Sequence, residues 1–192
     1  FVHWTLPALL GRWLSEEECS QFLEIWREVG QIINRQRSSL VLFDYHADNL
    51  MWLPDRSELR QVGLLDFQDA IVGPATYDLV SLIEDARRDV PDQLADALIS
   101  RYLDAFPSDQ ATFRAAYAAT AAQRNTRIIG VFGRLFLRDR KVGYLELLPR
   151  VWGLLERDLG HPGLSELRGW FDSHVPVKLR TVPDANCFVL PR

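Results

Sequence analysis

The sequence has no strong excess of charge and no long apolar run. Its 192 residues include 22 Lys and Arg against 26 Asp and Glu, which leaves a net charge of −4. That balance lacks the basic footprint of a nucleic-acid-binding protein. No run approaches the roughly 18 apolar residues of a membrane-spanning helix, and the first residues lack the charged and apolar regions of a signal peptide. We therefore expect a cytoplasmic protein with small-molecule ligands and neither nucleic acid nor membrane as a partner.

Cysteine, methionine and glycine-rich segments are also scarce. The two cysteines, Cys19 and Cys187, lie far apart and form no metal-ligand pattern. Reduced thiols fit a cytoplasmic protein, and one disulfide is the alternative. The sequence contains no glycine-rich loop of the type that cradles phosphates. It does not begin with Met, so we expect it to begin inside a longer protein, and nothing in it indicates an oligomeric state.

Apolar residues, by contrast, make up 47% of the chain, enough for the core of one domain or a large lobe. They recur at helical spacing after Ser15, which can cap a helix that begins with three glutamates. The same reasoning predicts helices at residues 76–88, 91–103, 107–137, 144–159 and 164–171. Closely spaced prolines predict an extended tail over residues 176–192. The predicted fold is α+β and mostly helical, with residues 1–175 forming one lobe.

Two short apolar runs, Leu50–Leu53 and Val62–Leu65, predict β-strands. Between them lies Pro54-Asp55-Arg56-Ser57, a segment typical of a turn. The two strands should therefore form an antiparallel hairpin. Asn49 precedes its first arm and Asp66 follows its second, so we expect these two side chains to be neighbours.

Asp44 follows another apolar run, Leu40–Phe43, where a predicted strand gives way to a loop. A carboxylate there can orient a hydroxyl group and accept its proton. Asn49 and Asp66 supply oxygen ligands of the kind that Mg²⁺ prefers, together with substrate phosphates. Each of the three residues, taken alone, is also common in turns or at strand ends. Together they are the parts of a phosphoryl-transfer site, with Asp44 as general base and Asn49 and Asp66 as metal ligands.

Other polar residues are weaker candidates. Those for substrate binding are His46, Asp48, Asp69, Arg124 and Asn125. Each has a structural alternative: a hydrogen bond within the loop, a loop cap, or buried bracing for the pair in the middle of a helix. Asp78, at the start of a helix after Gly73-Pro74, is expected to support the catalytic loop by accepting backbone N–H groups.

The segments DYHADNLM and LLDFQDAIVGPATYDLVSL resemble the aminoglycoside phosphotransferase/choline kinase family, whose fold is protein-kinase-like. The family motif is roughly His-x-Asp-x-x-x-x-Asn, followed by an apolar strand that ends in Asp. Asp44 and Asn49 stand at the first Asp and the Asn, and Asp66 at the second Asp. The longer segment is similar to a bacterial branch of kinases that phosphorylate the anomeric hydroxyl of N-acetylmuramate and N-acetylglucosamine. A weaker likeness extends over the helical remainder.

The chain departs from the family in two respects. Leu42 stands where the family has His, a residue that normally supports the catalytic loop. The family's N-terminal lobe, with a β-sheet, a phosphate-covering loop and a Lys that pairs with the ATP phosphates, has no counterpart here. The resemblance therefore implies a C-terminal lobe without its nucleotide-binding lobe, with little turnover by itself.

The resemblance implies a kinase that uses ATP and Mg²⁺ to phosphorylate a small-molecule hydroxyl, with an amino sugar as the first choice. An aminoglycoside, choline or a homoserine-like alcohol is the alternative. A cationic substrate would need an acidic pocket, for which the acidic residues between Glu84 and Asp104 are candidates. A pseudokinase that binds a ligand without catalysis is favoured by Leu42 and by the absent N-terminal lobe, and opposed by the complete set of Asp44, Asn49 and Asp66. A purely helical scaffold leaves that set unexplained.

Overall fold

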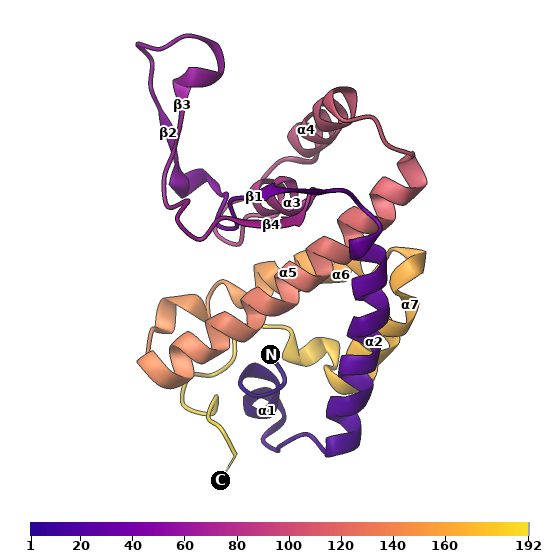
Figure 1. Cartoon of the computed structure of the whole chain (residues 1–192). Helices are drawn as coiled ribbons and strands as arrows, with labels where there is room; N and C mark the ends of the chain where they lie inside the picture. The colour runs from indigo at the N-terminus through magenta and orange to yellow at the C-terminus, as the bar shows by residue number, and fades with distance from the viewer. Residues whose placement is uncertain (192) are drawn as a thin grey trace.

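The computed structural model describes residues 1–191, so the last residue of the expected tail, Arg192, lies outside it. Figure 1 shows a mostly helical body from which a β-hairpin projects. The helices are α1 (Thr5–Leu10), α2 (Glu16–Asn34), α3 (Tyr77–Ile83), α4 (Asp92–Ala105), α5 (Gln110–Asp139), α6 (Leu148–Asp158) and α7 (Ser165–His174). The strands are β1 (Ser38–Val41), β2 (Leu50–Trp52), β3 (Val62–Leu64) and β4 (Ile71–Pro74). The prediction of a mostly helical chain with a small antiparallel sheet is confirmed.

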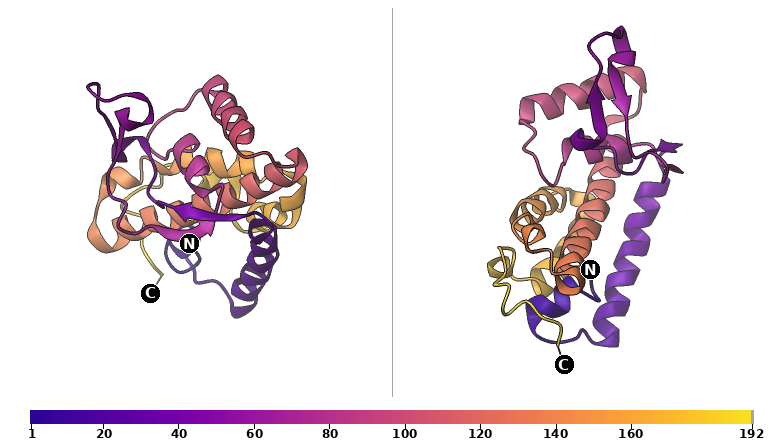
Figure 2. Two further views of the ribbon diagram at one scale, coloured as in Figure 1. Left: turned by 45° about the horizontal axis from the view of Figure 1, so that its top comes forward. Right: turned by 90° about the vertical axis from the view of Figure 1, so that its left-hand side faces the viewer.

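Helix α5 is the centre of the body. In the right-hand view of Figure 2 it lies between α2 and α6. Small and apolar side chains cover its buried faces, and Ile129 is fully buried. Trp152 and Leu155 of α6 and Phe171 of α7 are buried in the same core. Burial of such side chains contributes about 1.5–3 kcal/mol each, so the helical body holds most of the stability of the chain.

Glycines let α1 approach α5 closely. Thr5 donates a hydrogen bond from its hydroxyl to the carbonyl of Ile129 at 2.8 Å. A Cβ atom at Gly133 would overlap the Thr5 side chain, and one at Gly130 would lie 2.6 Å from the backbone nitrogen of Phe1. The absence of side chains at these two positions therefore sets the contact between α1 and α5.

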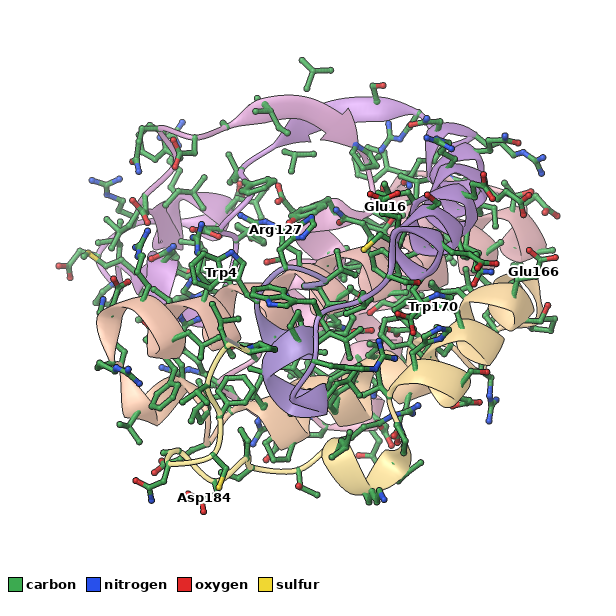
Figure 3. All side chains as sticks on the ribbon, turned by 90° about the horizontal axis from the view of Figure 1, so that it is seen from below. Trp4, Glu16, Arg127, Glu166, Trp170 and Asp184 are labelled. Carbon is green, nitrogen blue, oxygen red and sulfur yellow. The ribbon has the colours of Figure 1, made fainter. Side chains whose placement is uncertain are left out.

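Helix α7 packs against the first half of α2. Figure 3, seen from below, labels Trp170 on α7 and Glu16 at the start of α2. The rings of Phe22 and Trp170 lie 4.6 Å apart between their centroids. The predicted capping of α2 by Ser15 is also present, because its hydroxyl accepts the Glu18 N–H at 3.1 Å.

The chain forms a second two-stranded sheet that the sequence did not predict. Strand β1 covers Ser38–Val41 instead of Leu40–Phe43, and it pairs with β4, with Val41 opposite Ile71. It ends early because Phe43 takes a left-handed conformation with φ of 75°. Pro74, expected only to break the chain, is the last residue of β4, where a two-stranded sheet tolerates a residue without an N–H group.

Two predicted helices end or begin differently. Helix α3 ends at Ile83 instead of Arg88, because the Asp85 carboxylate accepts the Arg87 N–H at 2.8 Å and turns the chain into a loop. Helix α6 begins at Leu148 instead of Tyr144, since Pro149 favours the first turn of a helix. Helix α4 follows Pro91 as expected, but none of its residues is fully buried.

The tail is attached to the body. Residues 176–191 contain one short 3₁₀ turn, Val177–Leu179, and are otherwise irregular. Arg180 forms ion pairs with Glu156 of α6 and Asp172 of α7 at 3.0 and 2.9 Å. Phe188 is 1% exposed and lies 5.9 Å from the Phe136 ring. The segment that the sequence separates as a tail therefore contributes to the core of the helical body.

Two further observations concern the whole described chain. Within residues 1–191, no helix is both long enough and apolar enough to cross a membrane. Cys19 and Cys187 are both free thiols, so the alternative of a disulfide between them is not formed.

Candidate active site

The predicted hairpin is present and brings Asn49 and Asp66 to the same edge. Strands β2 and β3 pair antiparallel, with Leu50 opposite Leu64. The pairing continues by one residue, because the Leu65 N–H donates to the Asn49 carbonyl at 2.9 Å. Asn49 therefore lies opposite the residue that precedes Asp66. The hairpin is confirmed, with both residues at its open end, while the nearness of the Asn49 and Asp66 side chains stays a prediction.

Asp44 lies at the exit of a tight turn. Its N–H donates to the Leu42 carbonyl at 2.9 Å, and Phe43 between them has a positive φ. The Phe43 ring stacks on Tyr77 at 5.1 Å, and the Arg127 guanidinium lies 4.5 Å from the Phe43 ring centre. Contacts of the ring with α3 and α5 thus offset the backbone strain. The Asp44 side chain is exposed, so it is open to a substrate.

Asp78 fixes this turn from α3. Its two carboxylate oxygens accept the backbone N–H groups of Leu42 at 2.7 Å and Phe43 at 3.1 Å. These are hydrogen bonds of the kind expected for Asp78. Burial raises the pKa of the Asp78 carboxyl group, and the two N–H donors offset this only partly. Because the contacts reach the backbone, they do not depend on the side chain at Leu42.

The amide group of Asn49 is held on the Asp44 side of the hairpin. Its Nδ2 donates to the Asp44 carbonyl at 2.8 Å and lies 3.4 Å from Nε2 of His46. The backbone N–H of Asn49 also donates to the His46 carbonyl, at 2.9 Å. Asp44, His46 and Asn49 are therefore joined directly, and the amide nitrogen of Asn49 is in use.

Asp66 has a partner that the sequence did not suggest. Gln68 donates its side-chain N–H to Oδ1 of Asp66 at 2.6 Å. Asp66 itself has a φ of 55°, a left-handed conformation that turns the chain sharply after β3. Asp69 is exposed, and its side chain forms no hydrogen bond within residues 1–191, so the structure does not join it to the other candidates. The signal for Gln68 was its position two residues after Asp66, close enough in the chain for its amide to reach the Asp66 carboxylate across the bend.

Asp48 forms an ion pair with Arg88, a residue that sequence reasoning missed. The Arg88 guanidinium lowers the pKa of the Asp48 carboxyl group. Asp89, the next residue, pairs with Arg150 of α6. The loop between α3 and α4 is thus joined to the catalytic loop and to α6. No sequence signal could have paired Asp48 with Arg88, since 40 residues separate them.

Arg124 and Asn125 take part in a buried polar network. Asn125 is fully buried, and its Nδ2 donates to Glu84 at 2.7 Å and to Asp158 at 2.9 Å. Arg124 donates to the Glu84 carbonyl at 3.0 Å. Burial raises the pKa of Glu84, and burial together with the Glu84 charge raises the pKa of Asp158. These contacts favour buried bracing over substrate binding for Asn125.

A cavity of about 610 Å³ lies beside this network, between α4, α5 and the end of α6. Glu84 and Asp158 line it together with apolar residues such as Ile99 and Phe113. Neither Asp44, Asn49 nor Asp66 lines it. This cavity is therefore separate from Asp44, Asn49 and Asp66, the residues that are the candidates for phosphoryl transfer.

Comparison with known proteins shows the family of the chain. A model of the phosphotransferase enzyme family matches residues 2–119, which include all of the catalytic loop and the hairpin. The chain belongs to the phosphotransferase enzyme family. The resemblance drawn from the sequence is thereby confirmed.

Three curated relatives of the chain share one name. The N-acetylmuramate/N-acetylglucosamine kinase of Caulobacter vibrioides is 46% identical over 138 residues, which cover 71% of this chain and 38% of that protein. The proteins of the same name from Pseudomonas aeruginosa and Neisseria meningitidis are 33% and 30% identical over 179 and 168 residues. Those matches cover 87% and 82% of this chain. The chain spans about half the length of these two relatives, 50% and 48%.

A phosphotransferase site needs groups that hold a divalent cation, and the residues present fit one. Among the described residues, no three His, Cys, Asp or Glu side chains form a metal cluster. A Mg²⁺ ion needs fewer, because it usually combines one or two carboxylates with phosphate oxygens and waters. The amide nitrogen of Asn49 is already in use, which leaves Oδ1 as its acceptor, and Asp66 supplies a carboxylate at the same hairpin edge.

Proposed function

We propose that this phosphotransferase-family chain is the catalytic and substrate-binding lobe of an ATP-dependent kinase for an amino sugar. The observation that carries the proposal is the grouping of Asp44, Asn49 and Asp66 through one hydrogen bond and one hairpin. The relatives' name supports a sugar of the N-acetylmuramate or N-acetylglucosamine type. A protein-kinase-like C-terminal lobe that works in the cytoplasm, and a second lobe for the nucleotide, belong to the same proposal.

Asp44 acts as the general base in this mechanism. Its exposed carboxylate orients the sugar hydroxyl and accepts the proton as the oxygen attacks the γ-phosphorus of ATP. The bond between the γ-phosphorus and the oxygen that bridges to the β-phosphorus breaks, and ADP leaves. The sugar gains the phosphoryl group and Asp44 holds the proton.

Asn49 and Asp66 would hold Mg²⁺ through Oδ1 and a carboxylate oxygen, and the bound ion would neutralise charge on the ATP phosphates. The rest of the site contributes positioning. Asp78 fixes the turn before Asp44, and Gln68 restricts the Asp66 carboxylate. In phosphoryl transfer such positioning and charge stabilisation supply most of the catalysis.

The charge of the cavity bears on the alternative of a cationic substrate. Glu84, Asp92, Asp96 and Asp158 line it, which favours a cation, but Arg114 and Arg157 line it too. The two arginines offset part of the acidic charge, and an aminoglycoside or choline-type substrate is therefore the second candidate.

A non-catalytic pseudokinase is the other alternative. Leu42 supports it, because the family has His at this position. The direct contact of Asp78 with the backbone opposes it, since the turn before Asp44 is held without that His.

The test is Mg²⁺-dependent release of ADP by the whole protein. The acceptors are N-acetylmuramate, N-acetylglucosamine, an aminoglycoside and choline, and Asp44→Ala is the control variant. Release with an acetylated amino sugar that disappears in the variant supports the proposal. Release only with a cationic acceptor would replace the substrate class, and no binding of Mg²⁺-ATP by the folded protein would favour the pseudokinase.

A further inference from the structure

The environment of His46 gives this side chain a different role from the substrate contact considered above. Its Nε2 faces the Asn49 amide nitrogen at 3.4 Å. Its Nδ1 is buried and has no hydrogen-bond partner within residues 1–191. Neither ring nitrogen is therefore placed to form a hydrogen bond with an oxygen of a sugar or a phosphate.

The chemistry of the amide decides which nitrogen of His46 carries the proton. An amide nitrogen has two N–H donors and no acceptor. One of those donors is used by the Asp44 carbonyl at 2.8 Å, and the other faces His46. Nε2 of His46 must therefore be the acceptor, and the neutral ring carries its hydrogen on Nδ1. Nδ1 has no partner within residues 1–191, so the hydrogen bond recorded for the ring is the one at Nε2.

The same two contacts fix the orientation of the Asn49 amide. If the amide were rotated by half a turn, its oxygen would face the Asp44 carbonyl and the lone pair of Nε2, and both contacts would be repulsive. With the nitrogen held on this side, Oδ1 is the atom left to bind a cation. The Asp44 carbonyl supports this orientation in any variant, because it belongs to the backbone, whereas the second contact depends on His46.

We infer that His46 is a positioning residue, which fixes the Asn49 amide through Nε2 so that Oδ1 is presented as a ligand for the divalent cation. This inference rests on the proposed function, because it assumes that Asn49 is a metal ligand. His46 then contacts the metal ligand Asn49 and makes no contact with the substrate. Groups that orient a metal ligand in this way typically change metal affinity or activity by about 10- to 100-fold when they are removed.

The first test needs no variant and no turnover. Long-range ¹H–¹⁵N correlation spectra of the histidine rings of the whole protein, without metal, identify the protonated nitrogen of neutral His46. The expected tautomer is Nδ1–H, with Nε2 unprotonated. A neutral ring protonated on Nε2 would overturn the inference, whatever the enzyme proves to phosphorylate.

The second test compares His46→Leu, which removes the acceptor, with His46→Gln, whose side-chain oxygen can accept the same hydrogen. His3→Ala is the matched control, since His3 is exposed and the structure places it outside the site. We expect His46→Leu to raise the Mg²⁺ concentration needed for half-maximal rate by about 10- to 100-fold. The KM for the sugar should stay unchanged, and His46→Gln should restore much of the loss.

The outcomes separate this inference from the proposed function. A raised sugar KM with an unchanged Mg²⁺ requirement in folded His46→Leu would show a substrate contact and overturn the inference, while the kinase assignment stands. If the wild-type protein transfers phosphate to no acceptor, the proposed function fails, and the ring spectra still decide the tautomer. If His46→Leu does not fold, His46→Gln and the spectra carry the test.

Discussion

Asp78 accepts the backbone N–H of Leu42 at 2.7 Å, although 36 residues separate the two in the sequence. The contact fixes the turn before Asp44 from a neighbouring helix. It also explains how the loop holds its shape with Leu at the position where the family has His.

Replacing Asp78 should therefore lower the stability and the turnover number of the protein more than replacing Leu42. Asp78→Ala leaves two N–H groups without acceptors, and each such group costs about 1–3 kcal/mol of unfolding free energy when buried. Leu42→Ala keeps both hydrogen bonds. Denaturant unfolding and the turnover number of both variants check this, and an equal or larger loss for Leu42→Ala would show that the side chain, not the backbone contact, holds the turn.

The ion pair of Arg12 with Glu18, at the start of α2, predicts that the protein loses stability in acid. The Arg12 side chain, with the Ser15 N–H, lowers the pKa of Glu18 to about 2 from an ordinary value of 4.5. A lowered pKa means that the ionised form stabilises the fold above about pH 4.5, and that this contribution is lost as the pH falls toward 2. Glu18→Gln should remove this part of the pH dependence of the melting temperature, whereas Glu16→Gln, in the same helical turn, should retain it. The same acid slope in both variants would contradict the assignment.

The buried pair of Glu84 and Asp158 predicts a pH dependence of stability with the opposite sign. Burial raises both pKa values above the ordinary 4.5 and 3.8, so the folded state binds protons more tightly than the unfolded state. Stability then falls as the pH rises through the raised values. Asp158→Asn keeps a hydrogen-bond acceptor for Asn125 but removes one titrating group, so its unfolding free energy should depend less on pH. The exposed Glu166→Gln is the control, and an unchanged slope in Asp158→Asn would show that the pair does not titrate as described.

Two helical glycines, Gly133 of α5 and Gly153 of α6, should respond in opposite ways to an added methyl group. A methyl group at Gly133 would overlap Thr5, so Gly133→Ala should destabilise the fold by about 1–3 kcal/mol. Gly153 on α6 is exposed and has open space around it, so Gly153→Ala should stabilise the helix by about 0.5–1 kcal/mol. Thermal unfolding measures both, and a neutral Gly133→Ala would mean that α1 packs more loosely than the structure shows.

The sequence predicts the parts of the site that depend on local rules. A hairpin with a polar turn requires its two ends to meet, and that places Asn49 near Asp66 without further information. The capping of α2 by Ser15 is likewise local. Contacts between segments that are far apart in the chain have no such local sequence pattern. The pairing of β1 with β4 and the ion pair of Arg88 with Asp48 were therefore not predicted.

The sequence also does not predict the backbone conformation of a residue that occupies a rarely populated region of φ and ψ. An aromatic residue at positive φ is uncommon, and nothing in the sequence marks Phe43 for it. The conformation depends on Tyr77 and Arg127, which arrive from α3 and α5. Helix α4 shows the same limit, because its apolar spacing predicts a buried face, yet Leu94 is 50% exposed.

The central claim is that Asp44 is the base of a phosphoryl transfer, and one substitution tests it most directly. Asp44→Asn keeps the shape of the side chain and removes its ability to accept a proton. In the whole protein, with Mg²⁺-ATP and the acetylated amino sugar, we predict a fall in kcat of about 10²–10⁴-fold with the affinity for nucleotide unchanged. A variant that folds, binds nucleotide and retains its kcat would contradict the account.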